Sequence, residues 1–131
     1  MRHRGDLMSF LVVQACLKLI GFEFCLKRRK FSALYNKVRN YPLSTQLSTP
    51  DDVKRICAAV DVACVWYWKQ TLCLQRSATT ACLLRRYGAR AQLVIASRPM
   101  PFQAHAWVEV EGRVVNDKPD VQATYAVLDR C

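Results

Sequence analysis

Apolar positions recur at helical spacing through the first two thirds of the chain, and alternate with polar positions in the last third. We expect four helices, over residues 7–24, 31–39, 50–67 and 72–87. The third has the clearest start, because Thr49 can cap it and Pro50 suits its first position. Its apolar stripe is expected to be buried and comprises Val53, Ile56, Cys57, Val60, Cys64 and Tyr67.

Two segments of the last third have the alternation that is typical of strands. The first spans residues 89–97, and the second contains residues 104–110. Glu111-Gly112 then turns the chain into residues 113–117, which completes a hairpin, and residues 121–128 are expected to add an edge strand. The pattern predicts an α+β fold, with helices packed on a small antiparallel sheet.

Length and cysteine content exclude several classes of protein. A chain of 131 residues with 52% apolar residues can bury a core as one domain, residues 1–131, without cross-links. Seven cysteines without a C-x-x-C pair, and only two histidines, do not form a zinc motif. We therefore expect reduced thiols, a cytoplasmic location, and neither a metal nor a cofactor.

The N-terminus imitates a signal peptide, because Met1-Arg2-His3-Arg4 precedes an apolar run. Gln14, Lys18 and Glu23 interrupt that run, and we find no small-residue cleavage site and no apolar stretch long enough to span a bilayer. We expect a buried amphipathic helix here, and no integral membrane segment.

Positive charge is concentrated before Asp51, where nine of the twenty basic residues but only two of the ten acidic residues lie. Lys27-Arg28-Arg29-Lys30 is the densest run. It can be a solvated helical face, a surface for an acidic peptide or partner, or a contact for nucleic acid. Nucleic acid is the least favoured, because no basic platform interleaved with aromatic residues accompanies the charge.

The fourth predicted helix carries a candidate nucleophile, Cys73, in its first turn. Arg85 and Arg86 suit its last turn, Gly88 can close it, and Thr71 can serve as N-cap. The positive end of the helix dipole favours a thiolate at Cys73. The alternative is that Cys73 is an ordinary small apolar residue.

The candidate general base is His105, because His3 lies in a terminal tail whereas His105 stands on the predicted second strand. In the hairpin that follows, Asp117 can orient the imidazole if the register allows it. A two-residue turn at Glu111-Gly112 would point Asp117 away from the His105 side. A three-residue loop would place the two residues opposite each other, with Cβ atoms about 5 Å apart. We expect the three-residue loop, because it also pairs Glu109 with Arg113.

Cys73, His105 and Asp117 together have the composition of a catalytic triad: a thiolate nucleophile, a general base and acid, and a carboxylate that holds the imidazole tautomer. The Cys73 backbone N–H is a ready oxyanion donor, and no second donor can be identified. Trp66, Tyr67 and Trp68 are expected to form a wall of the core, or to shield the reacting pair from water. Arg76 can brace the loop over the site, contact a substrate carbonyl, or be a plain surface residue.

Several segments resemble the lasso-peptide leader peptidases, which are transglutaminase-like cysteine proteases of bacterial gene clusters. The resemblance is strongest over residues 53–117, and its motifs are Cys73-Leu74-Gln75-Arg76-Ser77, Leu83-Leu84-Arg85-Arg86-Tyr87-Gly88, Ala91-Gln92-Leu93-Val94-Ile95, the run from Pro101 through His105-Ala106-Trp107-Val108-Glu109, and Asn116-Asp117. It implies a papain-like or transglutaminase-like fold with a catalytic part at 50–131 after a helical part at 1–49. It also implies catalytic roles for Cys73, His105 and Asp117.

The resemblance further implies a bacterial cysteine endopeptidase that removes the leader from a lasso-peptide precursor. Its partners would be the precursor peptide, a separate leader-recognition protein and a lasso cyclase, because 131 residues leave no room for an added recognition domain. Two alternatives stay open. One is acyl transfer of the transglutaminase type by the same triad, and the other is a non-catalytic basic adaptor that binds peptide or nucleic acid.

Overall fold

The computed structural model describes residues 4–28, 31–45, 49–67, 72–99 and 102–131. Four helices precede the sheet: α1 (Arg4–Lys27), α2 (Phe31–Arg39), α3 (Pro50–Trp66) and α4 (Cys73–Arg86). The strands are β1 (Ala91–Pro99), β2 (Phe102–Val110), β3 (Arg113–Val114) and β4 (Ala126–Arg130), with the short helix α5 (Val121–Thr124) before β4. These elements agree with the α+β prediction.

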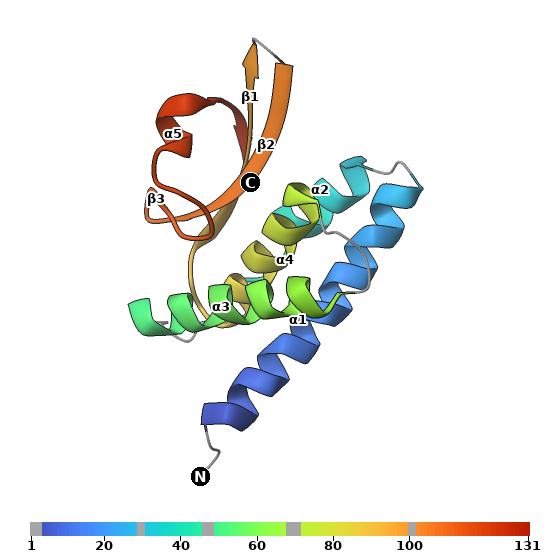
Figure 1. Cartoon of the computed structure of the whole chain (residues 1–131), viewed down its shortest axis with the longest axis vertical. Coiled ribbons are helices and arrows are strands. Elements are labelled where there is room, and N and C mark those ends of the chain that lie inside the picture. Colours follow the sequence, from blue (N-terminus) through green and yellow to red (C-terminus); the bar gives the residue numbers. More distant parts are fainter. Residues whose placement is uncertain (1–3, 29–30, 46–48, 68–71, 100–101) are drawn as a thin grey trace.

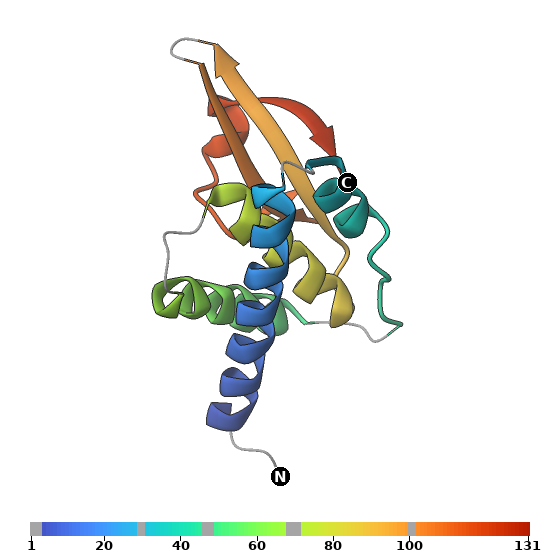
Figure 2. The same cartoon turned by 90° about the vertical axis from the view of Figure 1, so that its right-hand side faces the viewer.

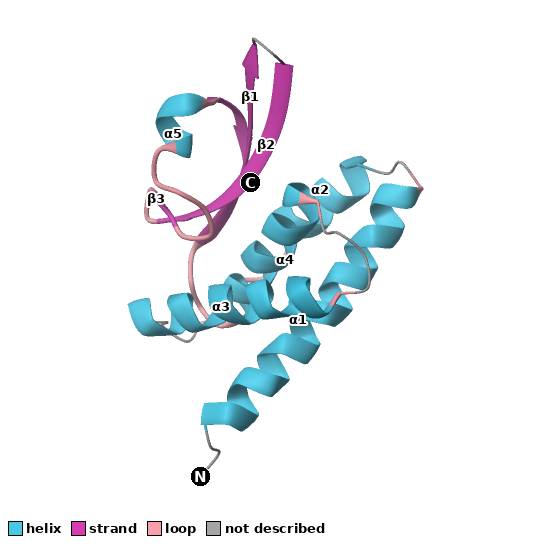
Figure 3. Ribbon diagram, viewed as in Figure 1, coloured by secondary structure: helices cyan, strands magenta, loops and turns pink. Residues whose placement is uncertain are grey.

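The sheet is antiparallel with the strand order β3-β2-β1-β4 (Figure 1). Helices α1 to α4 lie to one side of it and α5 to the other (Figure 3). The larger core lies between the helices and the sheet, and contains Leu19, Leu34, Val60, Leu84 and Val108. A smaller core under α5 contains Val94, Ala96, Trp107 and Val121. Each face of β1 and β2 is therefore covered by its own apolar cluster.

Local signals in the sequence account for the helix ends. Thr49 and Asp52 form a capping box at the start of α3, in which each side chain accepts the backbone N–H of the other. Gly88 has the positive φ of 93° expected of the residue that closes α4. The predicted stripe of α3 faces the core, because Ile56, Cys57 and Val60 are buried there.

The segment after Asp117 differs from the prediction of a single edge strand over 121–128. Residues 121–124 of this segment form α5, and the strand β4 begins only at Ala126. Val121 is buried against Trp107 under α5, so its apolar character belongs to a helix and not to a strand. The strand does lie at a sheet edge, where it pairs with β1.

Helix α1 contradicts two expectations: that it is a buried amphipathic helix, and that no apolar stretch is long enough to span a bilayer. Its buried residues are Leu11, Ala15, Leu19 and Phe22. A second row of large apolar side chains is exposed and comprises Phe10, Val13, Leu17, Ile20 and Phe24.

Residues 7–27 are also long and apolar enough to cross a membrane by length and composition alone, so the prediction that no such stretch exists is wrong. A core helix and a signal sequence pass the same test, so this finding is weak evidence for a membrane span. Figure 2 shows α1 in front of the other helices.

Candidate active site

Cys73 is the first residue of α4 and is partly buried. Leu72 occupies the N-cap position and makes no side-chain cap, whereas Thr71, the predicted cap, lies outside the described residues. Because a leucine side chain cannot accept a hydrogen bond, it does not compete for the N–H groups of the first turn. The start of α4 therefore offers Cys73 the positive end of the helix dipole, as expected.

His105 and Asp117 are paired directly. The imidazole Nε2 lies 2.5 Å from the Asp117 Oδ2, and both side chains are partly buried. The other carboxylate oxygen of Asp117 accepts the backbone N–H of Lys118 at 2.7 Å. With Nε2 occupied, Nδ1 is the imidazole nitrogen left for a thiol or a substrate. The carboxylate thus fixes both the orientation and the tautomer of the ring.

The hairpin that joins these residues has a different register from the one we predicted. Val110 faces Arg113, and Glu111 and Gly112 have positive φ angles of 52° and 78°, as in a two-residue turn of type I′. The three-residue loop is therefore wrong, and Glu109 faces Val114 instead of Arg113. The expected charge pair does not form, because Glu109 is buried and accepts hydrogen bonds from Trp107, Gln122 and Arg130.

Asp117 still meets His105, because the hairpin ladder ends early. The strand β3 stops at Val114, and the last backbone hydrogen bond runs from Val115 N–H to the Val108 carbonyl at 3.0 Å. The next ladder position is taken by a side chain, since Asn116 Oδ1 accepts the Val108 N–H at 2.8 Å. The chain bends at this point, so the alternation of a strand no longer dictates which way Asp117 points.

Cys73 makes no hydrogen bond to His105 or Asp117 within the described residues, but its helix is anchored beside them. Ser77, one turn after Cys73 on the same side of α4, donates a hydrogen bond of 3.1 Å to the carbonyl of Ala106. That carbonyl points to the same side of β2 as the Val108 carbonyl, where β3 has already ended. The start of α4 therefore lies along the open edge of β2, from which a side chain can reach the face that carries His105.

Two aromatic rings that sequence reasoning missed flank the imidazole. The centroid of Tyr125 is 5.2 Å from that of His105, and the centroid of Trp107 is 6.0 Å away. Alternation along β2 could have identified Trp107, which lies two residues from His105 and therefore on its face. The expected aromatic wall is wrong for Trp66, which is 79% exposed, while Tyr67 is buried and Trp68 lies outside the described residues.

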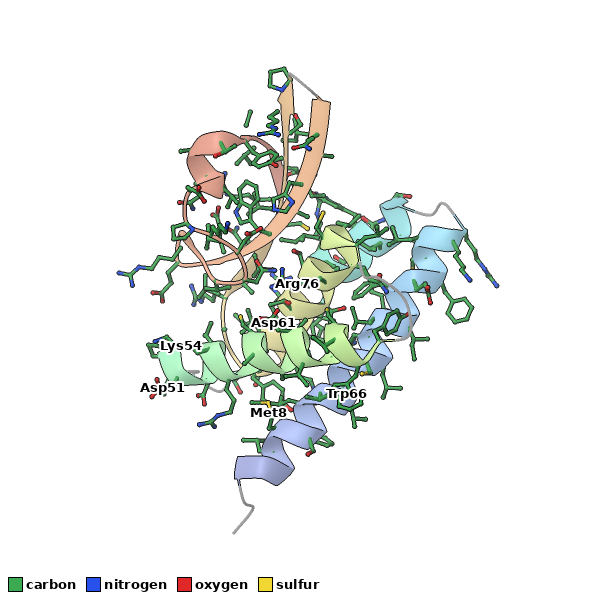
Figure 4. All side chains as sticks on the ribbon, viewed as in Figure 1. Met8, Asp51, Lys54, Asp61, Trp66 and Arg76 are labelled. Atoms are coloured by element: carbon green, nitrogen blue, oxygen red, sulfur yellow. The ribbon has the colours of Figure 1, made fainter. Side chains whose placement is uncertain are left out.

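Arg76 braces two helices. Its Nη2 and Nε lie 2.7 Å and 3.1 Å from the same carboxylate oxygen of Asp61, which places an ion pair between α4 and α3. Figure 4 shows Arg76 and Asp61 on these neighbouring helices. Arg76 therefore links α4 to α3, which is none of the three roles considered for it.

One cavity of the structure lies away from these residues. A cavity of about 440 Å³ is lined by residues that include Pro50, Lys54, Arg90 and Arg113, at the opposite end of α4 from Cys73. Among the described residues, no group of histidine, cysteine, aspartate and glutamate side chains could hold a metal ion. We place the candidate active site at the edge of β2, where Asp117 binds His105 beside the start of α4, and not in the cavity.

Comparison with known proteins identifies the family of the chain. The family model of the transglutaminase-like superfamily matches residues 16–130. Over 56 residues the chain is 39% identical to the microcin J25-processing protein McjB of Escherichia coli, a match that covers 43% of this chain but only 27% of the relative. No solved structure matches the chain. Since the superfamily match covers most of the sequence and the fold is α+β, the chain belongs to the transglutaminase-like superfamily.

Proposed function

We propose that this protein is a cysteine endopeptidase that removes the leader peptide from a lasso-peptide precursor. The observation that carries the proposal is the direct pairing of His105 with Asp117 beside the helix that begins at Cys73. The match to McjB adds the substrate class, because that relative is a processing protein for microcin J25. The match spans about a quarter of the length of that relative.

In the proposed reaction the Cys73 thiolate attacks the carbonyl carbon at the leader–core junction. The imidazolium of His105 then gives its proton to the leaving amine, and the C–N bond breaks to leave a thioester on Cys73. His105 next takes a proton from water, whose oxygen attacks the thioester and releases the peptide acid. Asp117 stabilises the imidazolium throughout, and the Cys73 backbone N–H can donate to the oxyanion.

Trp107 and Tyr125 have a supporting role in this scheme. Both rings lie against the imidazole, so they limit the access of water to the charged pair that forms during the reaction. The Trp107 indole N–H is held at 2.9 Å by Glu109, which keeps that wall in place.

We further propose that a separate leader-recognition protein docks on the outer face of α1, in the bacterial cytoplasm, and that a lasso cyclase uses the product. The exposed row of Phe10, Val13, Leu17, Ile20 and Phe24 supports this docking site, because a row of apolar side chains along one face of a helix is typical of protein interfaces. Lys27 and Arg28 are exposed at its C-terminal end, which suits a partner with an acidic rim.

The two rival functions differ from this proposal in their products. Acyl transfer by the same residues would join the acyl group of the substrate to an amine, whereas hydrolysis adds one water molecule and frees the leader. A non-catalytic adaptor would leave the precursor unchanged. Mass spectrometry of the precursor after incubation with the protein and its recognition protein separates all three outcomes.

The experiment that tests the proposal is replacement of the nucleophile. Cys73→Ala should abolish cleavage of the precursor without loss of the fold. Cys64→Ala, at another partly buried cysteine, is the matched control and should retain cleavage. Precursor processing that survives Cys73→Ala would show that the enzyme hypothesis is wrong.

A further inference from the structure

We propose that Ser77 and Asn116 are positioning residues that set the distance between the nucleophile and the acid–base pair; the inference rests on the proposed cysteine protease function. Three hydrogen bonds form a chain between α4 and the hairpin. Ser77 Oγ donates to the Ala106 carbonyl at 3.1 Å, Asn116 Nδ2 donates to Ser77 Oγ at 3.1 Å, and Asn116 Oδ1 accepts the Val108 N–H at 2.8 Å.

Each predicted site residue has one member of this chain beside it. Ser77 lies one turn after Cys73 on the same side of α4. Ala106 directly follows His105, and Asn116 directly precedes Asp117. The hydrogen bonds therefore connect the three segments that carry the three side chains, at the place where the sheet offers no backbone partner.

The two side chains match the groups around them. Ser77 is 1% exposed and Asn116 is 7% exposed, so solvent cannot replace a lost partner. The serine hydroxyl donates once and accepts once, and the asparagine amide uses its oxygen toward β2 and its nitrogen toward α4. An aliphatic side chain at either position would leave buried polar groups without partners.

Neither residue needs to touch substrate in order to affect the reaction. Cys73 and His105 must come within hydrogen-bond reach for a thiolate–imidazolium pair to form. Because the hydrogen-bonded chain fixes the first turn of α4 along the edge of β2, its loss lets that turn drift from the imidazole. The consequence is a less reactive Cys73 and not a weaker peptide site.

The test measures the reactivity of Cys73 without substrate. Iodoacetamide alkylation of Cys73 is followed by peptide mass spectrometry between about pH 5 and pH 9, in the wild type and in Ser77→Ala. The matched control is Thr80→Ala, which removes another buried hydroxyl of α4 that donates only to the Arg76 carbonyl of its own helix. Thermal unfolding of each variant reports the loss of stability separately.

We expect Ser77→Ala to slow alkylation of Cys73 near neutral pH about tenfold and to move its pH profile upward, while Thr80→Ala changes the rate by less than about twofold. Ser77→Thr keeps the hydroxyl and should restore the profile. If Ser77→Ala does not fold, Asn116→Ala, which removes the hydrogen bonds to Val108 and Ser77 and adds no charge, should show the same slowing.

Profiles that coincide in the wild type and the Ser77→Ala or Asn116→Ala variant would overturn the positioning role. The proposed function fails separately, if the wild type has a reactive Cys73 but cleaves no precursor. In that outcome the altered alkylation profile would still support the positioning role at a site with a different acyl substrate.

Discussion

Asp117 holds the His105 imidazole at 2.5 Å although the two residues do not face each other across a strand ladder. The contact depends on the bend that follows Val115, where the side chain of Asn116 replaces a backbone acceptor. Two consecutive side chains, Asn116 and Asp117, thus fix the orientation of the imidazole of His105. Asn116 ends the strand, and Asp117 binds the ring.

Replacement of Asp117 by asparagine should separate catalysis from folding. Asp117→Asn keeps the size of the side chain but lets an amide N–H face Nε2, which favours the wrong tautomer and cannot stabilise an imidazolium. We expect precursor cleavage to fall by roughly 10²- to 10⁴-fold with little change in thermal unfolding. Single-turnover cleavage and circular dichroism check the two parts. An unchanged rate would remove Asp117 from the proposed mechanism.

The cysteines should differ strongly in their reactivity toward alkylating reagents. Burial raises the pKa of Cys57 and of Cys82 to about 11, so both are almost entirely protonated at neutral pH. Cys73 is partly exposed at the start of a helix. Limited alkylation of the folded protein should therefore label Cys73 before Cys57 and Cys82, as read by peptide mass spectrometry. Labelling of Cys82 at the same rate would contradict the burial of that helix face.

Glu109 should make stability depend on pH. Burial raises the pKa of this carboxyl group, but hydrogen bonds from Trp107 and Gln122 and the charge of Arg130 outweigh burial and hold the pKa below its usual range. A lowered pKa in the folded state stabilises the protein above the unfolded pKa, and this stabilisation is lost as the pH falls through the folded pKa.

Glu109→Gln should therefore destabilise the protein by about 2 kcal/mol at neutral pH, because the hydrogen bonds from Trp107 and Gln122 lose their charged acceptor. The difference from the wild type should shrink as the pH falls below the unfolded pKa of a glutamate, about 4.3, and through the lower pKa of the folded state. Urea unfolding at several pH values measures it. A difference that does not change with pH would show that the charge of Glu109 does not contribute.

The proposed docking face on α1 can be tested with two leucines of equal exposure. Leu17 of α1 is 65% exposed and Leu128 of β4 is 64% exposed. Leu17→Glu should weaken binding of the recognition protein at least about tenfold and slow cleavage, because a carboxylate would have to be desolvated at the interface. Leu128→Glu should have little effect. Calorimetric titration compares them, and equal affinities would mean that the recognition protein binds elsewhere.

The helices and the fold class could be predicted because their signals are local. The Thr49 cap, Pro50 and the closing Gly88 mark helix ends through the backbone and nearest neighbours alone, and the structure has α2 over the residues expected, 31–39. The expectation of a buried amphipathic α1 failed because the helix has large apolar side chains on both its buried and its exposed side. Periodicity alone does not show which of two apolar rows faces the core.

The contact between His105 and Asp117 was predictable from the sequence, but the geometry of the hairpin that joins them was not. We expected Glu109 to pair with Arg113, but its carboxylate accepts hydrogen bonds from Trp107 and Gln122. These two residues come close to Glu109 only in the folded structure. The early end of β3 at Val114 could not be predicted from the sequence either, because Val115 continues the apolar run beyond the last paired residue of the strand. The pairing of His105 with Asp117 is confirmed, and the loop invoked to explain it is wrong.

The shortness of β3 suggests how sequence change can be tolerated in this hairpin. Residues inserted at the tip, between Glu111 and Gly112, would lengthen a solvent-exposed protrusion far from the reacting groups. An extension of the ladder at the other end would give the Ala106 carbonyl a backbone partner. That partner would displace Ser77, and with it α4, from the edge of β2. Variation in hairpin length should therefore accumulate at the tip, and selection should preserve the end of the ladder at Val115 and Asn116.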